Sequence, residues 1–131
     1  MTWDKDEFIA FRLQEAKDSL RAAKVLLVEG LYRESINRSY YAMFYSVLAL
    51  LVRSKIVTSK HSGAIAAFDV EYVKSGIFTK ELSHWYHRAF ELRQRADYKE
   101  FEPVDEVVAN TIYDHATIFV AEVMNRFEGS S

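Results

Sequence analysis

The chain has 131 residues, of which half are hydrophobic and 15% are aromatic, so it holds enough apolar material for one domain with a real core. It contains no cysteine, which excludes disulfides and thiolate metal sites and makes a reducing compartment the expected location. The formal net charge is −2, so the chain lacks the basic surplus of a general polyanion binder, and any contact with nucleic acid requires a local basic patch.

The N-terminal segment and the hydrophobic stretches are those expected of a cytoplasmic protein. Residues 1–8 lack the basic-then-apolar order of a signal peptide. The most apolar stretch, residues 40–52, is too short and too rich in tyrosine and serine to span a bilayer. We therefore expect a single domain over residues 1–128, a flexible tail over residues 129–131, and no membrane association.

Apolar residues at helical spacing predict the first two helices. The first is expected over residues 4–28, because Asp4 and Glu7 have the spacing of a capping box and Gly30 suits the turn after a helix. The second is expected over residues 32–55, with a wide apolar stripe that predicts a central position in the fold. This stripe consists of Ile36, Tyr40, Met43, Val47, Leu50 and Leu51.

Three further helices complete the predicted fold. A short one is expected over residues 61–74 and a longer one over residues 79–95. The last is expected over residues 103–127, with Pro103 in its first turn and the acidic Asp105 close to the positive end of the helix dipole. The pattern predicts an all-α fold, an antiparallel up-and-down bundle of four long helices plus one short helix.

The segment most suggestive of binding is residues 84–99, at the end of the fourth helix. Its positive side chains are Arg88, Arg93, Arg95 and Lys99. Arginine suits phosphate because its planar guanidinium donates two parallel hydrogen bonds, and Tyr86 and Tyr98 are candidates to stack on bases. The alternative is a solvated helix end with ordinary ion pairs. His84 and His87 share a helical face, but no third ligand is evident, so no metal is expected.

Two polar residues on other helices have less specific interpretations. Arg38 lies in the predicted central helix, and we expect it on an exposed face, with a pocket or interface as the alternative. His115 lies near the apolar face of the last helix, and we expect it in the core or at an interface.

Three segments taken together resemble the HEPN domain family. They are ELRQRADYKEF before the last helix, YRESINRSYYAMFYSVLALL in the second helix, and KHSG between them. The resemblance covers residues 8–127 and is closest to small stand-alone members. It implies a helical up-and-down bundle that commonly dimerises, and in many members a ribonuclease that acts without metal.

The family's active motif is an arginine, a spacer of four to six residues, and a histidine just before the last helix. The resemblance puts Arg93 at the arginine position and Tyr98 at the histidine position. Histidine transfers protons near neutral pH, whereas tyrosine titrates near pH 10, so cleavage is expected to be weak or absent. No other histidine has the right spacing; His61, for example, is too far from Arg53. The expected RNA- or nucleotide-binding residues are Arg88, Arg93, Arg95, Asp97 and Lys99.

The resemblance leaves three functions open. The first is an RNA- or nucleotide-directed component of a prokaryotic toxin–antitoxin or stress module, partnered by a minimal nucleotidyltransferase. In related members that partner adds nucleotides to a tyrosine near the motif, which here is Tyr98. The second is a catalytically inactive nucleotide-binding module, and the third a purely structural dimer. A homodimer is expected in each case, since nine Phe, eight Tyr and two Trp exceed what a small core hides easily. No cofactor is expected.

Overall fold

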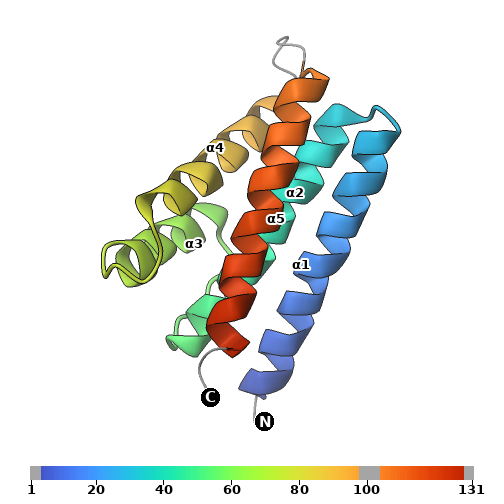
Figure 1. Cartoon of the computed structure of the whole chain (residues 1–131). Coiled ribbons are helices and arrows are strands. Elements are labelled where there is room, and N and C mark those ends of the chain that lie inside the picture. Colours follow the sequence, from blue (N-terminus) through green and yellow to red (C-terminus); the bar gives the residue numbers. More distant parts are fainter. Residues whose placement is uncertain (1–3, 98–103, 129–131) are drawn as a thin grey trace.

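Helices make up all the regular structure in the computed structural model, which describes residues 4–97 and 104–128, apart from the side chains of residues 96 and 97. The elements in chain order are α1 (Lys5–Val28), α2 (Tyr32–Arg53), α3 (His61–Phe68), the π-helical turn η1 (Asp69–Val73), α4 (Lys80–Asp97) and α5 (Glu106–Glu128) (Figure 1). The predicted all-α fold of four long helices and one short helix is confirmed. In the described ranges, no helix is long and apolar enough to cross a membrane.

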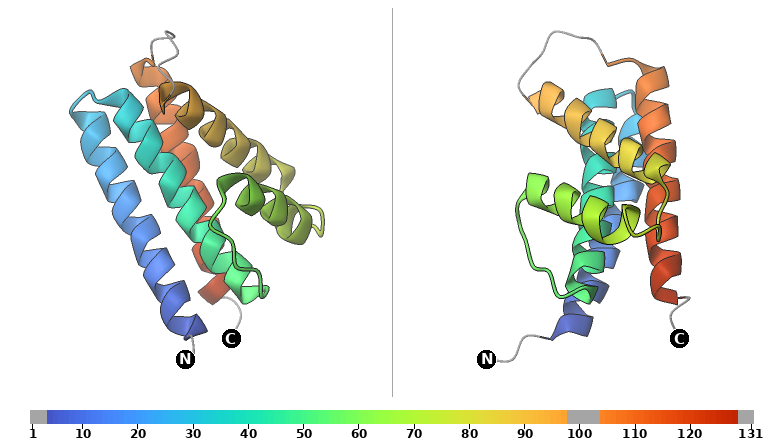
Figure 2. Two further views of the ribbon diagram at one scale, coloured as in Figure 1. Left: turned by 180° about the vertical axis from the view of Figure 1, so that it is seen from behind. Right: turned by 90° about the vertical axis from the view of Figure 1, so that its left-hand side faces the viewer.

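Helix α2 is the centre of the bundle. It contacts α1, α3, α4 and α5, while α1 and α5 lie along it and α4 packs obliquely on its other side, next to the short α3 (Figures 1 and 2). All six residues of the predicted apolar stripe are buried, from Ile36 to Leu51. The prediction of a central helix is therefore confirmed, and its two adjacent tyrosines, Tyr40 and Tyr41, lie on the side where α3 and α4 pack.

Small side chains allow α1 and α2 to pack closely. Ala16 and Ala23 of α1 and Ala42 of α2 are fully buried. The Ser35 hydroxyl donates a hydrogen bond of 2.8 Å to the Ala23 carbonyl, which satisfies a polar group inside this contact.

The helix ends follow the predicted capping chemistry at α1 but not at α5. The Asp4 carboxylate accepts a hydrogen bond of 3.1 Å from the Glu7 amide, as predicted, and Gly30 adopts a φ of 79°. Residue 103, the predicted start of the last helix, lies outside the described residues, and residues 104 and 105 are not helical. Helix α5 starts at Glu106, because the carboxylate of Asp105 accepts a hydrogen bond of 2.9 Å from the Val108 amide and so caps the helix.

The predicted short helix over residues 61–74 ends in a π-helical turn. The Lys74 amide donates to the Asp69 carbonyl at 2.8 Å, five residues back. The Asp69 carboxylate accepts hydrogen bonds of 2.6 Å from Ser83 and from His87, both on α4. These bonds fix η1, and with it the short helix α3, against α4.

Candidate functional site

Arg93, which the resemblance puts at the arginine position of the motif, lies against two tyrosines of the central helix. Its Nη2 donates a hydrogen bond of 3.2 Å to the Tyr41 hydroxyl. Its Cζ lies 5.4 Å from the ring centroid of Tyr41 and 5.8 Å from that of Tyr40, within the range of a cation–π interaction. These contacts orient the guanidinium before any ligand binds, which reduces the entropic cost of binding an anion there.

A second guanidinium, that of Arg38, lies over the same tyrosine. Its Cζ is 4.9 Å from the Tyr41 ring centroid, and its Nη2 donates to the Asn37 side-chain oxygen at 3.2 Å. Among the described residues no carboxylate forms an ion pair with Arg38. Two positive groups that contact one ring make the potential around Tyr41 more positive, which favours an anion there.

His61, the first residue of α3, joins these residues from a third helix. Its Nδ1 is 2.6 Å from the Tyr40 hydroxyl, and its ring stacks on Phe44 with centroids 4.3 Å apart. Burial, and then the positive charge of Arg93, lower the pKa of His61, so the imidazole is neutral at pH 7. Burial raises the pKa of Tyr40, so its hydroxyl stays protonated. We refer to Arg38, Tyr40, Tyr41, His61 and Arg93 together as the Arg93 cluster.

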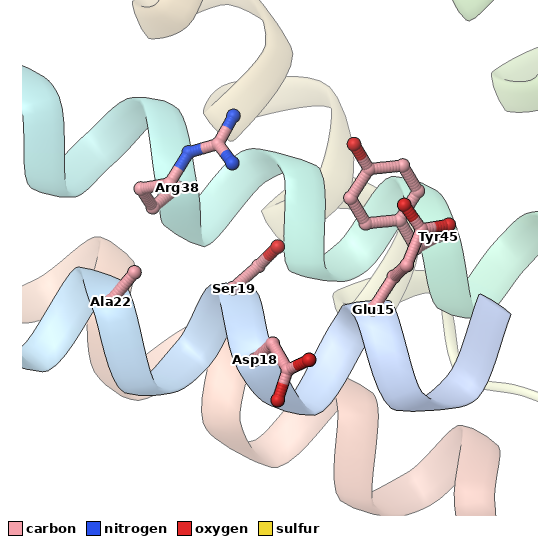
Figure 3. A pocket seen from close by; sticks show the side chains of 6 residues that line it. All are labelled: Glu15, Asp18, Ser19, Ala22, Arg38 and Tyr45. Carbon is pink, nitrogen blue, oxygen red and sulfur yellow. The ribbon is translucent and has the colours of Figure 1, made fainter. Parts of the chain in front are cut away.

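A small groove between α1 and α2 begins at Arg38. It has a volume of about 250 Å³ and is lined by Glu15, Asp18, Ser19, Ala22, Arg38 and Tyr45 (Figure 3). In Figure 3 the guanidinium of Arg38 points away from the two carboxylates that α1 contributes. Those carboxylates repel an anion, and the groove is smaller than the roughly 300–1,000 Å³ of typical ligand pockets. An anionic ligand is therefore favoured at the Arg93 cluster and not in the groove.

The other predicted binding residues lie away from the Arg93 cluster or outside the described residues. Arg95 forms an exposed ion pair of 2.9 Å with Glu91, and Arg88 lies close enough to His115 on α5 to lower the pKa of that histidine, after the larger effect of burial. Arg95 is two residues after Arg93 and Arg88 is five residues before it, so neither lies on the same face of α4 as Arg93. The Asp97 side chain, Tyr98 and Lys99 lie outside the described residues.

The structure also tests the predictions made for Tyr86 and His115. Tyr86 is fully buried, so the prediction that it stacks on bases is wrong; its ring fills the core between Tyr40 and Phe119. His115 is half-buried and stacks on Trp85 with centroids 4.2 Å apart, which agrees with a packing role. The described residues contain no group of three or more side chains placed to bind a metal.

Three members of the Arg93 cluster, Tyr40, Tyr41 and His61, were not predicted from the sequence. His61 was rejected because only histidines at a fixed spacing after an arginine match the motif, Tyr40 was placed in the apolar stripe of the second helix, and Tyr41 was given no binding role. For Tyr40 the packing role is correct, since the side chain is fully buried, but its hydroxyl also holds His61. The one sequence feature that pointed to His61 was the KHSG segment, which contains this residue and is part of the family resemblance.

The fold and the Arg93 cluster together define a small helical bundle with an arginine–tyrosine–histidine site formed by α2, α3 and α4. The HEPN domain profile matches residues 9–126, and the chain belongs to the HEPN domain family. A UPF0332 protein of Thermotoga maritima is 42% identical over 103 residues, which cover 79% of this chain and 78% of that protein. A protein of Methanocaldococcus jannaschii named "Putative toxin MJ0605" is 33% identical over 120 residues, covering 92% of this chain and 89% of that protein.

Proposed function

We propose that this HEPN protein acts on RNA and that the Arg93 cluster binds a phosphate of the RNA backbone. The observation that carries the proposal is the pair of guanidinium groups, Arg38 and Arg93, held over the ring of Tyr41. Guanidinium groups bind phosphate through charge-assisted hydrogen bonds, and both of these groups contact the same tyrosine ring. With a net charge of −2 the chain depends on such a local site for its affinity.

The biological setting that we propose is a prokaryotic toxin–antitoxin or stress module. Support comes from two proteins of Methanocaldococcus jannaschii, "Putative toxin MJ0605" and "Putative toxin MJ0142", which align over most of this chain. The proposed partner is a minimal nucleotidyltransferase, and the proposed acceptor of its nucleotide is Tyr98, five residues after Arg93. A nucleotide attached there adds negative charge five residues after Arg93 in the sequence, which disfavours the binding of RNA phosphate. Mass spectrometry after co-expression with a neighbouring transferase tests this, since Tyr98→Phe removes the expected mass increase.

We further propose that the protein is a homodimer. Helix α1 exposes large apolar side chains along its outer surface, among them Phe11 (58% exposed), Val25 (59%) and Val28 (71%). Apolar side chains gathered on one helix commonly mark a protein interface. In a symmetric dimer, the same surface of a second copy covers them.

RNA binding by single variants tests the phosphate site. Fluorescence anisotropy with a labelled single-stranded RNA is measured for the wild type, Arg93→Ala and Arg95→Ala. Loss of a charged hydrogen bond of about 1–3 kcal/mol weakens binding by Arg93→Ala roughly 5- to 150-fold. Arg95→Ala removes one positive charge from the same helix, but Arg95 is exposed and pairs with Glu91, so only a small loss of RNA affinity is expected. Equal losses in the two variants would show general electrostatic binding without a specific site, and no binding by the wild type would favour the structural dimer.

A further inference from the structure

His61 combines a fixed ring with one accessible nitrogen. Nδ1 is held by the Tyr40 hydroxyl at 2.6 Å, and the ring is stacked on Phe44. The other nitrogen, Nε2, has no hydrogen-bond partner among the described residues and is not one of their enclosed polar atoms, so it reaches solvent. An oriented imidazole with one free nitrogen has the arrangement that a general base requires.

The surroundings of His61 favour its basic form and supply the groups that a phosphate needs. The titratable and charged groups that face it are Tyr40 and Tyr41 from α2 and Arg93 from α4. The lowered pKa of His61 leaves its imidazole unprotonated near neutral pH. Arg93 and His61 contact the same two tyrosine rings, and Arg93 lies close enough for its charge to act on the imidazole, so a phosphate bound by its guanidinium lies near His61.

We propose that His61 is the proton acceptor for metal-independent cleavage of RNA at the Arg93 cluster, an inference that rests on the proposed function. The ring proton of His61 is on Nδ1, which donates to the Tyr40 oxygen, so Nε2 has a free lone pair. Nε2 removes the proton of a ribose 2′-hydroxyl, and the 2′-oxygen forms a bond to the adjacent phosphorus. The bond from phosphorus to the 5′-oxygen breaks, the leaving oxygen takes a proton from water, and a 2′,3′-cyclic phosphate remains. Arg93 stabilises the negative charge that grows on the phosphate oxygens. His61 then returns its proton to solvent.

This assignment changes the expectation drawn from the family motif. Weak cleavage was expected because Tyr98 occupies the histidine position of that motif. His61 supplies a proton-transfer group from α3 instead, and Tyr40 positions it through Nδ1. Substrates are restricted to RNA, because DNA lacks the 2′-hydroxyl that attacks.

Cleavage of a single-stranded RNA by the full-length protein, with EDTA present, tests the inference. The wild type is expected to release 2′,3′-cyclic phosphate ends and to leave a fully 2′-deoxy substrate intact. His61→Gln is expected to lower the rate about 10²- to 10⁴-fold while RNA affinity is retained. His84→Gln makes the same substitution at an exposed position of α4 and is expected to keep the wild-type rate. Circular dichroism confirms that each variant is folded.

The pH dependence of the wild-type rate provides a second readout that needs no variant. If His61 must be unprotonated, the rate rises with pH through a midpoint below 6.5 and then levels off. Absence of cleavage by the wild type, a wild-type rate in His61→Gln, or a flat profile across this range would overturn the inference. If Arg93→Ala still weakens RNA binding in any of these cases, the proposed RNA-binding function is retained and only the role of His61 is excluded. If Arg93→Ala binds RNA as well as the wild type, both the proposed function and the role of His61 are excluded.

Discussion

The contact between Arg93 and Tyr41 holds the proposed site together, and its strength can be measured without any ligand. In a double-mutant cycle, Arg93→Ala, Tyr41→Leu and the double variant are compared with the wild type. A cation–π contact at a half-buried position contributes about 0.5–1 kcal/mol. The hydrogen bond adds about 0.5 kcal/mol, because 3.2 Å is at the long end of the normal range. We therefore expect a coupling free energy of roughly 1–1.5 kcal/mol.

Urea denaturation followed by circular dichroism gives the four unfolding free energies of this cycle. Tyr41→Phe, which keeps the ring and removes the hydroxyl, is expected to retain the cation–π part of the coupling. A matched cycle of Tyr41 with Arg95 is expected to be additive, since Arg95 pairs with Glu91 instead. A coupling below about 0.3 kcal/mol between Arg93 and Tyr41 would refute the argument that the site is preoriented.

Three further predictions concern stability and assembly. Folding lowers the pKa values of His61 and His115, so the unfolded chain binds more protons than the folded chain below pH 6.5. The unfolding free energy should therefore be constant above pH 6.5 and fall below it, by less than about 1.4 kcal/mol per pH unit for each partly exposed ring. A flat profile from urea melts would contradict this. Asp105→Ala should cost about 1 kcal/mol of stability through loss of the α5 cap, and no change in the urea midpoint would argue against that role. Sedimentation should give twice the chain mass of 15.2 kDa, and Val28→Glu should shift it to monomer; a monomeric wild type at micromolar concentration would exclude the dimer.

Much of the fold could be predicted because helix periodicity and capping are local properties. The stripe of α2 and the Asp4 cap of α1 needed only residues a few positions apart. The start of α5 was misplaced because Pro103 and Asp105 both suit a helix start, and only the hydrogen bond from the Val108 amide to Asp105 decides between them. The π-helical turn at η1 was missed because Asp69 has its side-chain partners on α4, outside any local pattern.

The candidate site was only partly predictable, because it is formed by three helices. Arg93 could be identified from its place in the family motif. Its contact with Tyr41 joins residues 52 positions apart, and the hydrogen bond of Tyr40 with His61 joins residues 21 positions apart. No spacing rule within one helix relates such pairs, and only the packing of α3 and α4 on α2 brings them together.

The measurement that tests the phosphate site most directly is an NMR titration of the arginine side chains. Protein labelled with ¹⁵N in arginine is titrated with a short single-stranded RNA, and the Nε–H signals are assigned by single Arg→Lys substitutions. The account predicts that the signals of Arg38 and Arg93 shift together along one binding curve, while the signal of Arg95 shifts little. Saturable shifts at Arg88 and Arg95 with none at Arg93 would place the RNA on another face of α4 and contradict the central claim.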